Sequence, residues 1–399
     1  MNILMLTPYL PYPPNSGGQI RSYNLIKQLS KKHSITLCSL VKFEEDKKYI
    51  NKLKPYCKEI YVFKRAEKPF TLKNILKTGF STYPFVVIRN FSSEENSNLP
   101  LIIQKENFDL IHAETFYVSP HIPESLSLPI VLVDQTIEFQ VYEHYVKNFK
   151  IPILRPLLYL DVLKLKHWEI FYWKKAAKVI AVSKRDADIM QQVLPKLNVE
   201  IVPNGVGEDL IENVPLHFNK NIVFMGNYSW LQNIEAANYL AKEVFPLIKN
   251  KIKEAKLSIV GQYTGKVKNL KSNDIEVIDL SIDDIKGVQK YFRESGVLVA
   301  PLYGPGGTRL KILAAMAAKL PVVTTKVGIA GIEATNGENV LIGQTSQELA
   351  DLTVLLLKDK KKYTQIAQNA RNFVEENFFY ESIAKKLDKV YQDVVKKDA

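Results

Sequence analysis

The sequence predicts an α/β protein made of two doubly wound domains that face a central cleft. Short β-branched runs alternate with segments of helical period along the whole chain, which is the pattern of parallel sheets covered by helices. The alternation pauses near Pro203 and then restarts, and 399 residues are enough for two or three buried cores. We therefore expect one domain over residues 1–205 and a second over 206–377.

The expected elements follow in order along the chain. In the first domain the apolar runs predict strands over residues 2–6, 35–40, 60–63, 110–113, 130–133 and 179–182. Between the first two strands, Ile20, Tyr23, Ile26 and Leu29 recur every three residues and predict an amphipathic helix. In the second domain the strands are expected over residues 221–225, 257–260, 275–278, 297–300 and 322–325, and a helical pattern covers the tail, 363–395.

Composition excludes several classes of protein. Apolar residues make up 46% and charged residues 24%, which is close to a soluble globular average and excludes wholesale disorder. Two cysteines cannot form a disulfide framework or a multi-cysteine metal site, so a reducing compartment is expected. The sequence has neither an apolar run of about 18 residues nor a cationic leader with a cleavage site. We expect a cytoplasmic protein.

The net charge of +12 lies mostly in the first half of the chain. Up to Gly205, 28 lysines and arginines stand against 19 acidic residues, whereas beyond it the numbers are 26 and 23. This asymmetry indicates an anionic partner for the first domain, either nucleic acid or a phospholipid surface.

A glycine-rich loop follows the expected strand 297–300. Gly306 and Gly307 precede Thr308, which is placed to cap a helix that carries Arg309 and Lys311 in its first turn. Glycines allow close backbone approach, and a helix N-terminus with two cations attracts an anion, so the loop predicts a diphosphate site. The alternative is a plain strand-to-helix turn, in which the helix dipole would disfavour both cations.

Other motifs of nucleotide and metal chemistry are absent from the sequence. There is no G-x-x-x-x-G-K-[ST], no G-x-G-x-x-G after the first strand, no H-E-x-x-H and no C-x-x-C, so an NTPase, a nicotinamide dehydrogenase and a zinc enzyme are not supported. Asp186 and Asp188 have the D-x-D spacing of metal-dependent sugar transferases. Ser183, three residues before Asp186, instead indicates a capped helix start.

A second anion-binding site is expected between the first strand and the first helix. Gly17 and Gly18 lie just before that helix and Arg21 lies in its first turn. This loop would lie on the wall of the cleft opposite the Gly306–Lys311 loop. The alternative is a proline-rich structural loop.

Three polar residues are placed at the carboxyl ends of strands in the first domain. His112 ends one strand and would face the cleft, although a lone histidine is often a core or loop residue with its hydrogen bonds satisfied. Asp134 and Glu138 follow the next strand and could hold hydroxyl groups of a sugar or a lipid headgroup. The alternative for this pair is a capped helix start.

The segment 147–178 combines eight lysines and arginines with two acidic residues, Trp168, Trp173 and several other aromatic residues. Its run 151–160 is too short to span a bilayer but has the cationic, aromatic and aliphatic mixture of interfacial helices. We therefore expect peripheral docking on an anionic membrane surface. The alternative is an ordinary long helix packed under the first sheet.

Taken together, these motifs resemble the retaining nucleotide-sugar glycosyltransferases of family 4, also called group 1, which have the GT-B fold of two Rossmann-like domains. The resemblance covers nearly the whole chain. It rests on Gly17-Gly18 with Arg21, Phe108-Asp-Leu-Ile-His112, Val179-Ile-Ala-Val-Ser183, Val202-Pro-Asn-Gly205, Phe224-Met-Gly226-Asn227 with Asn233, Gly306-Gly-Thr-Arg-Leu-Lys311, and Pro321-Val-Val-Thr.

The resemblance implies a site for each domain. The second domain would bind the sugar donor through Gly226, Asn227, Gly306, Gly307, Thr308, Arg309, Lys311 and Glu333. The first would bind the acceptor through Gly17, Gly18, Arg21, Asp134 and Glu138, with His112 as the catalytic residue near the transferred sugar. A C-terminal helix over 378–399 would cross back to the first domain. No metal or other cofactor is expected, because backbone amides and cations would stabilise the departing diphosphate.

The sequence also departs from the family pattern. The family usually has two glutamates eight positions apart around the glycine-rich loop, and this chain has Gly306 and Ala314 there. Losing the second glutamate removes a carboxylate partner of the donor's ribose. Such a loss usually weakens the free energy of donor binding by about 1.5–3 kcal/mol. Glu333, after the next strand, could replace it. The arginine and lysine that often follow the first strand of the second domain are also missing, where Gly226-Asn-Tyr-Ser-Trp230 stands.

The predicted function is transfer of a hexose, with retention, from a nucleoside diphosphate sugar to a glycan or lipid-linked acceptor in cell-surface polysaccharide or glycolipid synthesis. The enzyme would be cytoplasmic and peripheral on the inner face of the membrane, and it would not bind nucleic acid. Two alternatives remain at this stage. One is a non-catalytic GT-B subunit that scaffolds a partner transferase, and the other is a nucleotide-sugar epimerase of the same fold.

Overall fold

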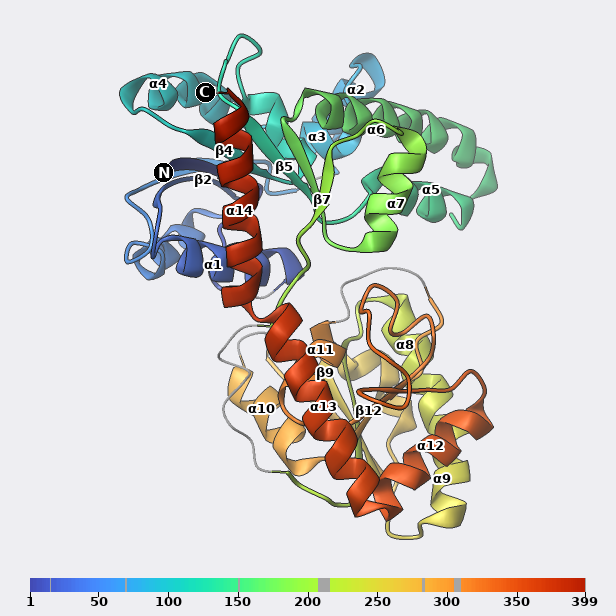
Figure 1. Ribbon diagram of the computed structural model, residues 1–399. Coiled ribbons are helices and arrows are strands. Elements are labelled where there is room, and N and C mark those ends of the chain that lie inside the picture. The colour runs from blue at the N-terminus through green and yellow to red at the C-terminus, as the bar shows by residue number, and fades with distance from the viewer. Residues whose placement is uncertain are drawn as a thin grey trace. The chain divides into compact units, whose positions relative to one another are not determined.

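The computed structural model describes residues 1–14, 16–68, 70–149, 151–206, 216–281, 284–304 and 310–398 (Figure 1). The chain divides into two compact units. Unit 1 comprises Met1–Pro203 and Ile383–Ala399, and unit 2 comprises Asn204–Ser382. The chain thus leaves unit 1 after Pro203 and re-enters it at Ile383, so that the C-terminal residues belong to unit 1.

Unit 1 is built on a seven-stranded sheet with the order β3-β2-β1-β4-β5-β6-β7, in which every neighbouring pair is parallel. The order reverses between β1 and β4, and ligands of such sheets bind outside the carboxyl ends of the strands at this switch point. The strands are β1 (Asn2–Thr7), β2 (Ser34–Val41), β3 (Glu59–Lys64), β4 (Leu110–Glu114), β5 (Ile130–Asp134), β6 (Lys178–Ala181) and β7 (Val199–Ile201).

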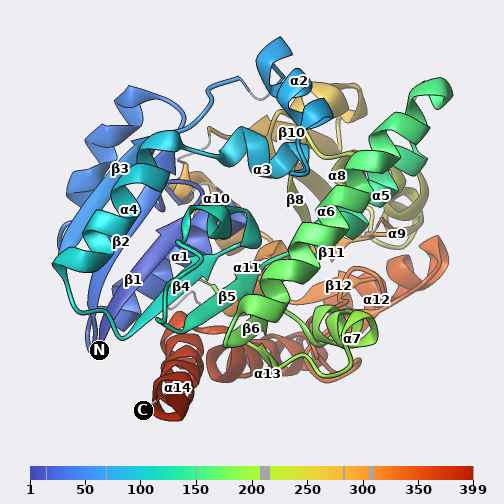
Figure 2. The same cartoon turned by 90° about the horizontal axis from the view of Figure 1, so that it is seen from above.

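Helices cover the sheet of unit 1, and the period-2 alternation of strand side chains decides which residue meets which helix. Leu4 and Leu6 of β1 and Ile111 of β4 pack in one core cluster with residues of α3, α4 and α6, the helices that lie in front of the sheet in Figure 2. The helices are α1 (Gly17–Leu29), η1 (Glu44–Lys52), α2 (Leu72–Phe80), α3 (Phe85–Asn90), α4 (Ser93–Lys105), η2 (Phe116–His121), α5 (Glu138–Lys147), η3 (Pro152–Leu154), α6 (Arg155–Lys175), α7 (Lys184–Val193) and α14 (Tyr380–Asp398).

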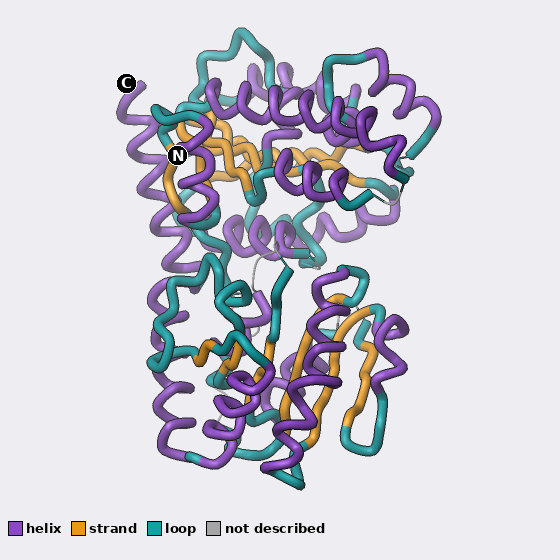
Figure 3. Tube along the Cα trace, turned by 90° about the vertical axis from the view of Figure 1, so that its right-hand side faces the viewer, coloured by secondary structure: helices purple, strands orange, loops and turns teal. Residues whose placement is uncertain are grey.

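Unit 2 repeats this architecture with six parallel strands in the order β10-β9-β8-β11-β12-β13, flanked by helices (Figure 3). The strands are β8 (Asn221–Asn227), β9 (Lys256–Gln262), β10 (Ile275–Asp279), β11 (Val297–Ala300), β12 (Val322–Thr324) and β13 (Leu341–Ile342). The helices are α8 (Leu231–Tyr239), the π-helical turn η5 (Leu240–Val244), α9 (Phe245–Lys251), η6 (Thr264–Leu270), α10 (Ile285–Glu294), α11 (Leu310–Ala317), α12 (Ser346–Lys358) and α13 (Lys360–Phe378).

Every strand predicted from the sequence is present, with ends shifted by at most two residues. Strands buried on both faces read as continuous apolar runs, and all four residues of β11 are indeed buried. The sequence did not predict β7, whose middle residue Glu200 is exposed, or β13, which has two residues. The predicted helical tail forms two helices, because Phe379 has extended backbone between α13 and α14.

Two predictions from composition can be compared with the structure. Cys38 and Cys57 are both free. In the part of the chain that the structure describes, no helix combines the length and the apolar character needed to cross a bilayer.

Candidate active site

The sheet of unit 2 reverses its strand order between β8 and β11, and polar groups gather at the carboxyl ends of these two strands. Strand β8 ends in Gly226 and Asn227, and α11, which follows β11, carries Lys311 as its second residue. The Lys311 Nζ lies 2.5 Å from Asn233 Oδ1 and 4.8 Å from the centre of the Phe224 ring. The amine is therefore held at the switch point of the sheet by a neutral amide oxygen and an aromatic face.

Asn233 of α8 connects the Lys311 amine to the end of β8. It lies in the first turn of α8, is 8% exposed, and donates from Nδ2 to the Asn227 carbonyl over 2.7 Å. The Asn227 side chain in turn donates to Gln262 Oε1 over 2.9 Å and accepts from the Ser229 backbone N–H over 2.9 Å. The loop between β8 and α8 is thus tied to the end of β9, and the first turns of α8 and α11 approach the same point.

Close backbone approach makes glycine necessary at this edge. A Cβ on Gly226 would lie 3.0 Å from Asn233 Cγ and 3.1 Å from Lys311 Nζ. Gly261 in β9 has φ +145°, and its Cβ would lie 1.8 Å from the Gly226 carbonyl oxygen. A side chain at Gly226 would crowd the lysine amine, and one at Gly261 would collide with the backbone of β8.

The segment after β12 forms another part of the edge. The Thr324 hydroxyl donates to the Ala300 carbonyl over 2.6 Å, and the Gly328 N–H donates to the Thr325 hydroxyl over 2.9 Å. Both threonines are fully buried, so they fix where the loop leaves the sheet. Glu333 lies further along this loop and is exposed to solvent.

Of the donor-binding residues predicted from the sequence, the structure brings Gly226, Asn227 and Lys311 together. Gly306, Gly307, Thr308 and Arg309 lie outside the described residues. Asn233 was not among the predicted donor-binding residues. Its position in the helix after Gly226-Asn227 was the signal that could have identified it. Ala314 is 5% exposed and packs in the core of unit 2.

At the corresponding edge of unit 1, four side chains form a buried network. Arg21 Nε donates to Glu114 Oε1 over 3.0 Å, and the two side chains are 0% and 1% exposed. The other carboxylate oxygen lies 2.5 Å from His112 Nε2, and His112 Nδ1 lies 2.6 Å from the Tyr391 hydroxyl of α14. Gln135 adds a further hydrogen bond from Nε2 to Glu114 Oε1 over 2.6 Å.

The network determines the ionisation of its carboxylate and its tyrosine. Burial acts to raise the pKa of Glu114, but the Arg21 charge and the hydrogen bond with His112 outweigh it, so that the pKa lies below the usual 4.5. Burial raises the pKa of Tyr391 well above its usual value. Glu114 is therefore an ionised carboxylate facing a guanidinium inside unit 1.

The predicted position of His112 at the strand end is wrong. Strand β4 continues to Glu114, so His112 is its third residue and is 0% exposed. Both ring nitrogens have partners within unit 1, namely Glu114 and Tyr391. The alternative stated for a lone histidine, a core residue with satisfied hydrogen bonds, is the one that the structure supports.

The prediction of an anion-binding site at the start of α1 also needs correction, in the position of its glycines and in the direction of Arg21. Gly17 and Gly18 are the first two residues of α1, after the N-cap Ser16, rather than part of the loop before it. A Cβ on Gly18 would lie 2.0 Å from the Tyr9 hydroxyl oxygen, so this glycine makes room for a side chain of unit 1. Arg21 points inward, where Glu114 balances its charge and the Val202 and Pro203 carbonyls accept from its Nη1 over 3.1 and 2.8 Å.

Asp134 and Glu138 likewise occupy an internal position. Asp134 is 1% exposed and accepts from Trp173 Nε1 over 2.7 Å. Glu169 of α6 caps α5, because its carboxylate accepts from the backbone N–H groups of Glu138 and Phe139 over 2.8 and 3.0 Å. The helix start is capped, as the alternative prediction had it, but the cap comes from another helix.

Burial changes the protonation of these three carboxyl groups. It raises the pKa of Asp134, and together with the neighbouring Asp134 charge it raises the pKa of Glu169. Burial also raises the pKa of Glu138, to about 7. Asp134 is therefore a buried carboxyl group that is hydrogen-bonded to Trp173, and its side chain is not exposed at the surface of unit 1.

The D-x-D spacing is a helix start, as predicted. Ser183 is the N-cap of α7, and its hydroxyl oxygen accepts from the Asp186 backbone N–H over 3.1 Å. Asp188 pairs with Lys184 over 2.9 Å on the exposed face of the same helix. Among the described residues, no group of three or more histidine, cysteine, aspartate or glutamate side chains could hold a metal ion.

The fold and the polar side chains at the carboxyl edge of the unit 2 sheet indicate a class of protein. Two parallel α/β units, one with a lysine amine held over a glycine at the switch point of its sheet, are the features of an enzyme that binds an anionic nucleotide. Two family models then match the chain. The model described as "Glycosyltransferase Family 4" matches residues 15–210, and that described as "Glycosyl transferases group 1" matches residues 219–359. The chain belongs to this family of glycosyltransferases.

Comparison with other proteins agrees with this family and its GT-B fold. An uncharacterized 44.6 kDa protein in the cps region of Klebsiella pneumoniae is 22% identical and covers 94% of this chain and 96% of its own length. The sucrose-phosphate synthase of Thermosynechococcus elongatus is 15% identical, covers 100% of both chains and has a TM-score of 0.68. Anabaena Alr3699/HepE in complex with UDP-glucose is 17% identical, covers 98% of this chain and 100% of its own, and has a TM-score of 0.64.

Proposed function

We propose that this glycosyltransferase moves a hexose from a nucleoside diphosphate sugar to a glycan or lipid-linked acceptor, with retention of configuration, in the synthesis of a cell-surface polysaccharide or glycolipid. Two comparisons support the choice of substrates. The Anabaena protein of the same fold was crystallised with UDP-glucose, and the Klebsiella relative is a protein of the cps region.

The observation on which the proposal rests is the position of Lys311. Its amine lies at the switch point of the unit 2 sheet, against Asn233 and over the backbone of Gly226. A diphosphate at this point would meet a fixed cation and the backbone N–H groups at the starts of α8 and α11. Lysine side chains and helix N-termini are both common phosphate-binding groups in proteins.

The chemistry follows from the charge of the leaving group. Breaking the bond between the sugar and the diphosphate leaves negative charge on the phosphate oxygens, and a fixed cation stabilises that charge more than the charge of the intact donor. Lys311 would supply this stabilisation together with Arg309, Thr308 and the amides of Gly306 and Gly307. No metal ion is needed in this scheme, and the acceptor proton would leave through a phosphate oxygen of the donor.

The remaining donor contact would come from Glu333. The exposed carboxylate lies in the loop after β12, at the carboxyl edge of the sheet, and could bind the ribose hydroxyls in place of the glutamate that Ala314 replaces. Substituting Glu333 by alanine would then weaken nucleotide binding. Unchanged binding would remove Glu333 from the donor site.

We place the enzyme in the cytoplasm, peripheral on the inner face of an anionic membrane, with no role for nucleic acid. The cationic segment 147–178 and the positive surplus of the first half of the chain support this location. The tryptophans of the segment, however, serve the fold. Trp173 is fully buried, and Trp168 stacks on Tyr83 with ring centres 4.3 Å apart.

The proposal is tested by thermal stabilisation of the purified protein with UDP-, GDP-, ADP- and TDP-sugars, with and without EDTA, because a ligand of the native state raises the melting temperature. We expect a shift with one base that EDTA leaves unchanged. Lys311→Met should weaken that ligand by about 10- to 100-fold, the equivalent of a lost charged hydrogen bond of roughly 1.5–3 kcal/mol. The matched control is Lys253→Met, an exposed lysine of the same unit.

Each alternative function predicts a different result. No shift with any nucleotide sugar would favour a non-catalytic subunit that scaffolds a partner transferase. Conversion of the donor sugar without an acceptor would favour an epimerase. Equal nucleotide affinity in wild type and Lys311→Met would refute the assignment of the diphosphate site.

A further inference from the structure

Helix α2 of unit 1 presents an uncovered apolar stripe. It has no buried residue, and Leu72, Ile75, Leu76 and Phe80 share one face at helical spacing. Their side chains are 73%, 53%, 51% and 92% exposed. Amphipathic helices of globular proteins turn this face toward the core. In α2 the apolar face points away from the core instead.

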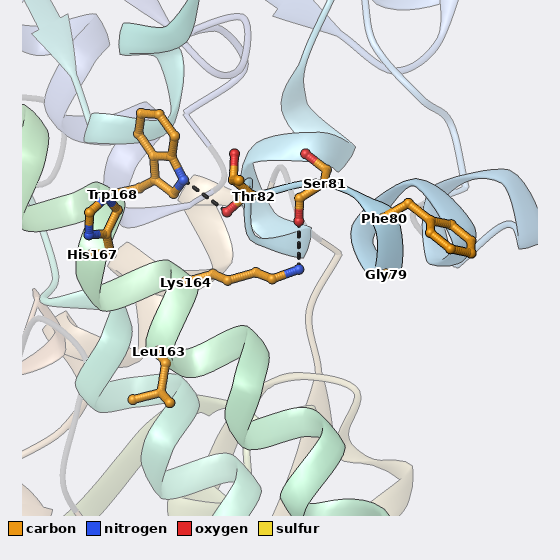
Figure 4. Close-up of a pocket in the computed structure, with 8 residues that line it drawn as sticks. All are labelled: Gly79, Phe80, Ser81, Thr82, Leu163, Lys164, His167 and Trp168. Atoms are coloured by element: carbon orange, nitrogen blue, oxygen red, sulfur yellow. Dashed lines mark hydrogen bonds between the residues drawn. The ribbon is translucent and has the colours of Figure 1, made fainter.

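Backbone contacts, rather than its apolar side chains, hold α2 in this orientation. Lys164 of α6 donates from Nζ to the carbonyls of Thr78 and Ser81 at the end of α2, over 2.7 and 2.6 Å. Trp168 donates from Nε1 to the Thr82 carbonyl over 2.9 Å. Figure 4 shows both side chains reaching from α6 to the turn after α2, whereas Phe80 extends away from them.

The first half of α6 adds further exposed leucines. Leu154 precedes the helix, and Leu157, Leu160 and Leu163 follow it at intervals of three residues, with exposures of 41%, 66%, 56% and 49%. Leu163 and Phe80 line the same shallow pocket between the two helices. We call this the α2–α6 surface, formed by Leu72, Ile75, Leu76, Phe80, Leu154, Leu157, Leu160 and Leu163.

The charges around α2 are of one sign. Residues 68–93, around α2, include Lys68, Lys73, Lys77 and Arg89 and no aspartate or glutamate. Near the start of α6, Lys147 pairs with Glu143 over 3.1 Å and Asp161 follows Leu160, so the positive surplus lies around α2. A second copy of the chain would bring like charges together. An anionic bilayer fits both the positive charge and the exposed apolar side chains. Its phosphates attract the cations, and its acyl chains accept the apolar side chains.

We propose that the α2–α6 surface docks unit 1 on an anionic lipid bilayer, with the apolar side chains of α2 entering the headgroup boundary and Lys73 and Lys77 at the lipid phosphates. This deepens the membrane location given under the proposed function, on which it rests, by assigning the contact to α2 and to the leucines of α6. The two tryptophans of the segment 147–178, which are buried or stacked within unit 1, are not the anchors.

The test is co-sedimentation of the full chain with vesicles of phosphatidylcholine, with and without phosphatidylglycerol. We expect binding to the anionic vesicles that weakens with salt, since exposed charge interactions are screened. The triple variant Leu72→Ser/Leu76→Ser/Phe80→Ser should lower the partition coefficient by about tenfold or more, because it removes the side chains that would enter the bilayer. Lys73→Gln/Lys77→Gln should lower it on anionic vesicles only.

The matched control is Phe43→Ser/Leu101→Ser/Leu355→Ser, which removes three exposed apolar side chains outside the surface, with exposures of 47%, 62% and 41%. It should bind vesicles as the wild type does. Equal loss in control and test variants, or no binding by the wild type, would overturn the proposal. So would a wild-type dimer that the test variant converts to a monomer, since the surface would then join two copies. Stabilisation by nucleotide sugars, measured on the same variants, reports on the donor site of unit 2 separately.

Discussion

Breaking the buried pair Arg21–Glu114 should strongly destabilise unit 1. Its atoms are 3.0 Å apart and its side chains at most 1% exposed, so removing one partner leaves an uncompensated charge in the core. Such a loss costs about 3–5 kcal/mol. Arg21→Met and Glu114→Gln should therefore each lower the free energy of unfolding of unit 1 by about this amount.

The double variant Arg21→Met/Glu114→Gln separates the interaction from its surroundings. Because the second substitution removes a charge that the first has already left unpaired, the double variant should cost less than the sum of the two, by at least about 1.5 kcal/mol. The control is Lys184→Met, which breaks an exposed pair within α7 of the same unit. It should cost no more than about 0.5 kcal/mol.

The assay is urea unfolding followed by tryptophan fluorescence in a Trp230→Phe background. Of the three tryptophans, Trp168 and Trp173 lie in unit 1 and Trp230 in unit 2, where it is 61% exposed. The remaining signal therefore reports on unit 1. A cost below about 1 kcal/mol for Arg21→Met, or additive costs in the double variant, would refute the argument that the buried pair is a coupled unit.

Glu114 should make the stability of unit 1 fall at acidic pH. Because the pKa of Glu114 is lower in the folded state than its usual 4.5, its contribution is present above pH 4.5 and is lost as the pH falls through the folded-state value. Wild-type unit 1 should lose stability below about pH 4.5 more steeply than Glu114→Gln does. Parallel curves for the two proteins would contradict this assignment.

Two further predictions concern other buried positions. Gly261→Ala should destabilise unit 2 by more than about 2 kcal/mol in urea unfolding, since φ is +145° and the Cβ would meet the Gly226 carbonyl at 1.8 Å, whereas Gly265→Ala, with open space around its Cβ, should change little. Glu95 is fully buried, its Oε2 lies 3.5 Å from His121 Nδ1, and burial raises its pKa to about 8. Its contribution is present at low pH and is lost as the pH rises from about 4.5 to 8, so Glu95→Gln should raise the melting temperature at pH 8 but not at pH 4.5. An equal effect at both pH values would show that Glu95 does not titrate in this range.

The lengths of the parallel strands were predictable because burial on both faces demands continuous apolar sequence. The run Val297–Ala300 became β11 without a change of bounds. The end of β4 was not predictable in this way, because a buried histidine and a buried glutamate interrupt the apolar pattern. The predicted strand therefore ended before Glu114, and His112 was expected at an edge that the chain reaches two residues later.

The sequence by itself determined the two α/β units, the family and the glycine-rich loop that leads to Lys311, since these depend on local pattern and on spacing along the chain. Only the tertiary structure decided which charges are satisfied internally. Arg21 meets Glu114 across 93 residues and His112 meets Tyr391 across 279, and no local pattern records such pairs. Burial then decides whether a charged side chain can meet a ligand. A charge that is paired in the core is costly to unpair and is not presented to a ligand. Lys311 lies against the Asn233 amide at the carboxyl edge of the unit 2 sheet, where we propose that the diphosphate binds.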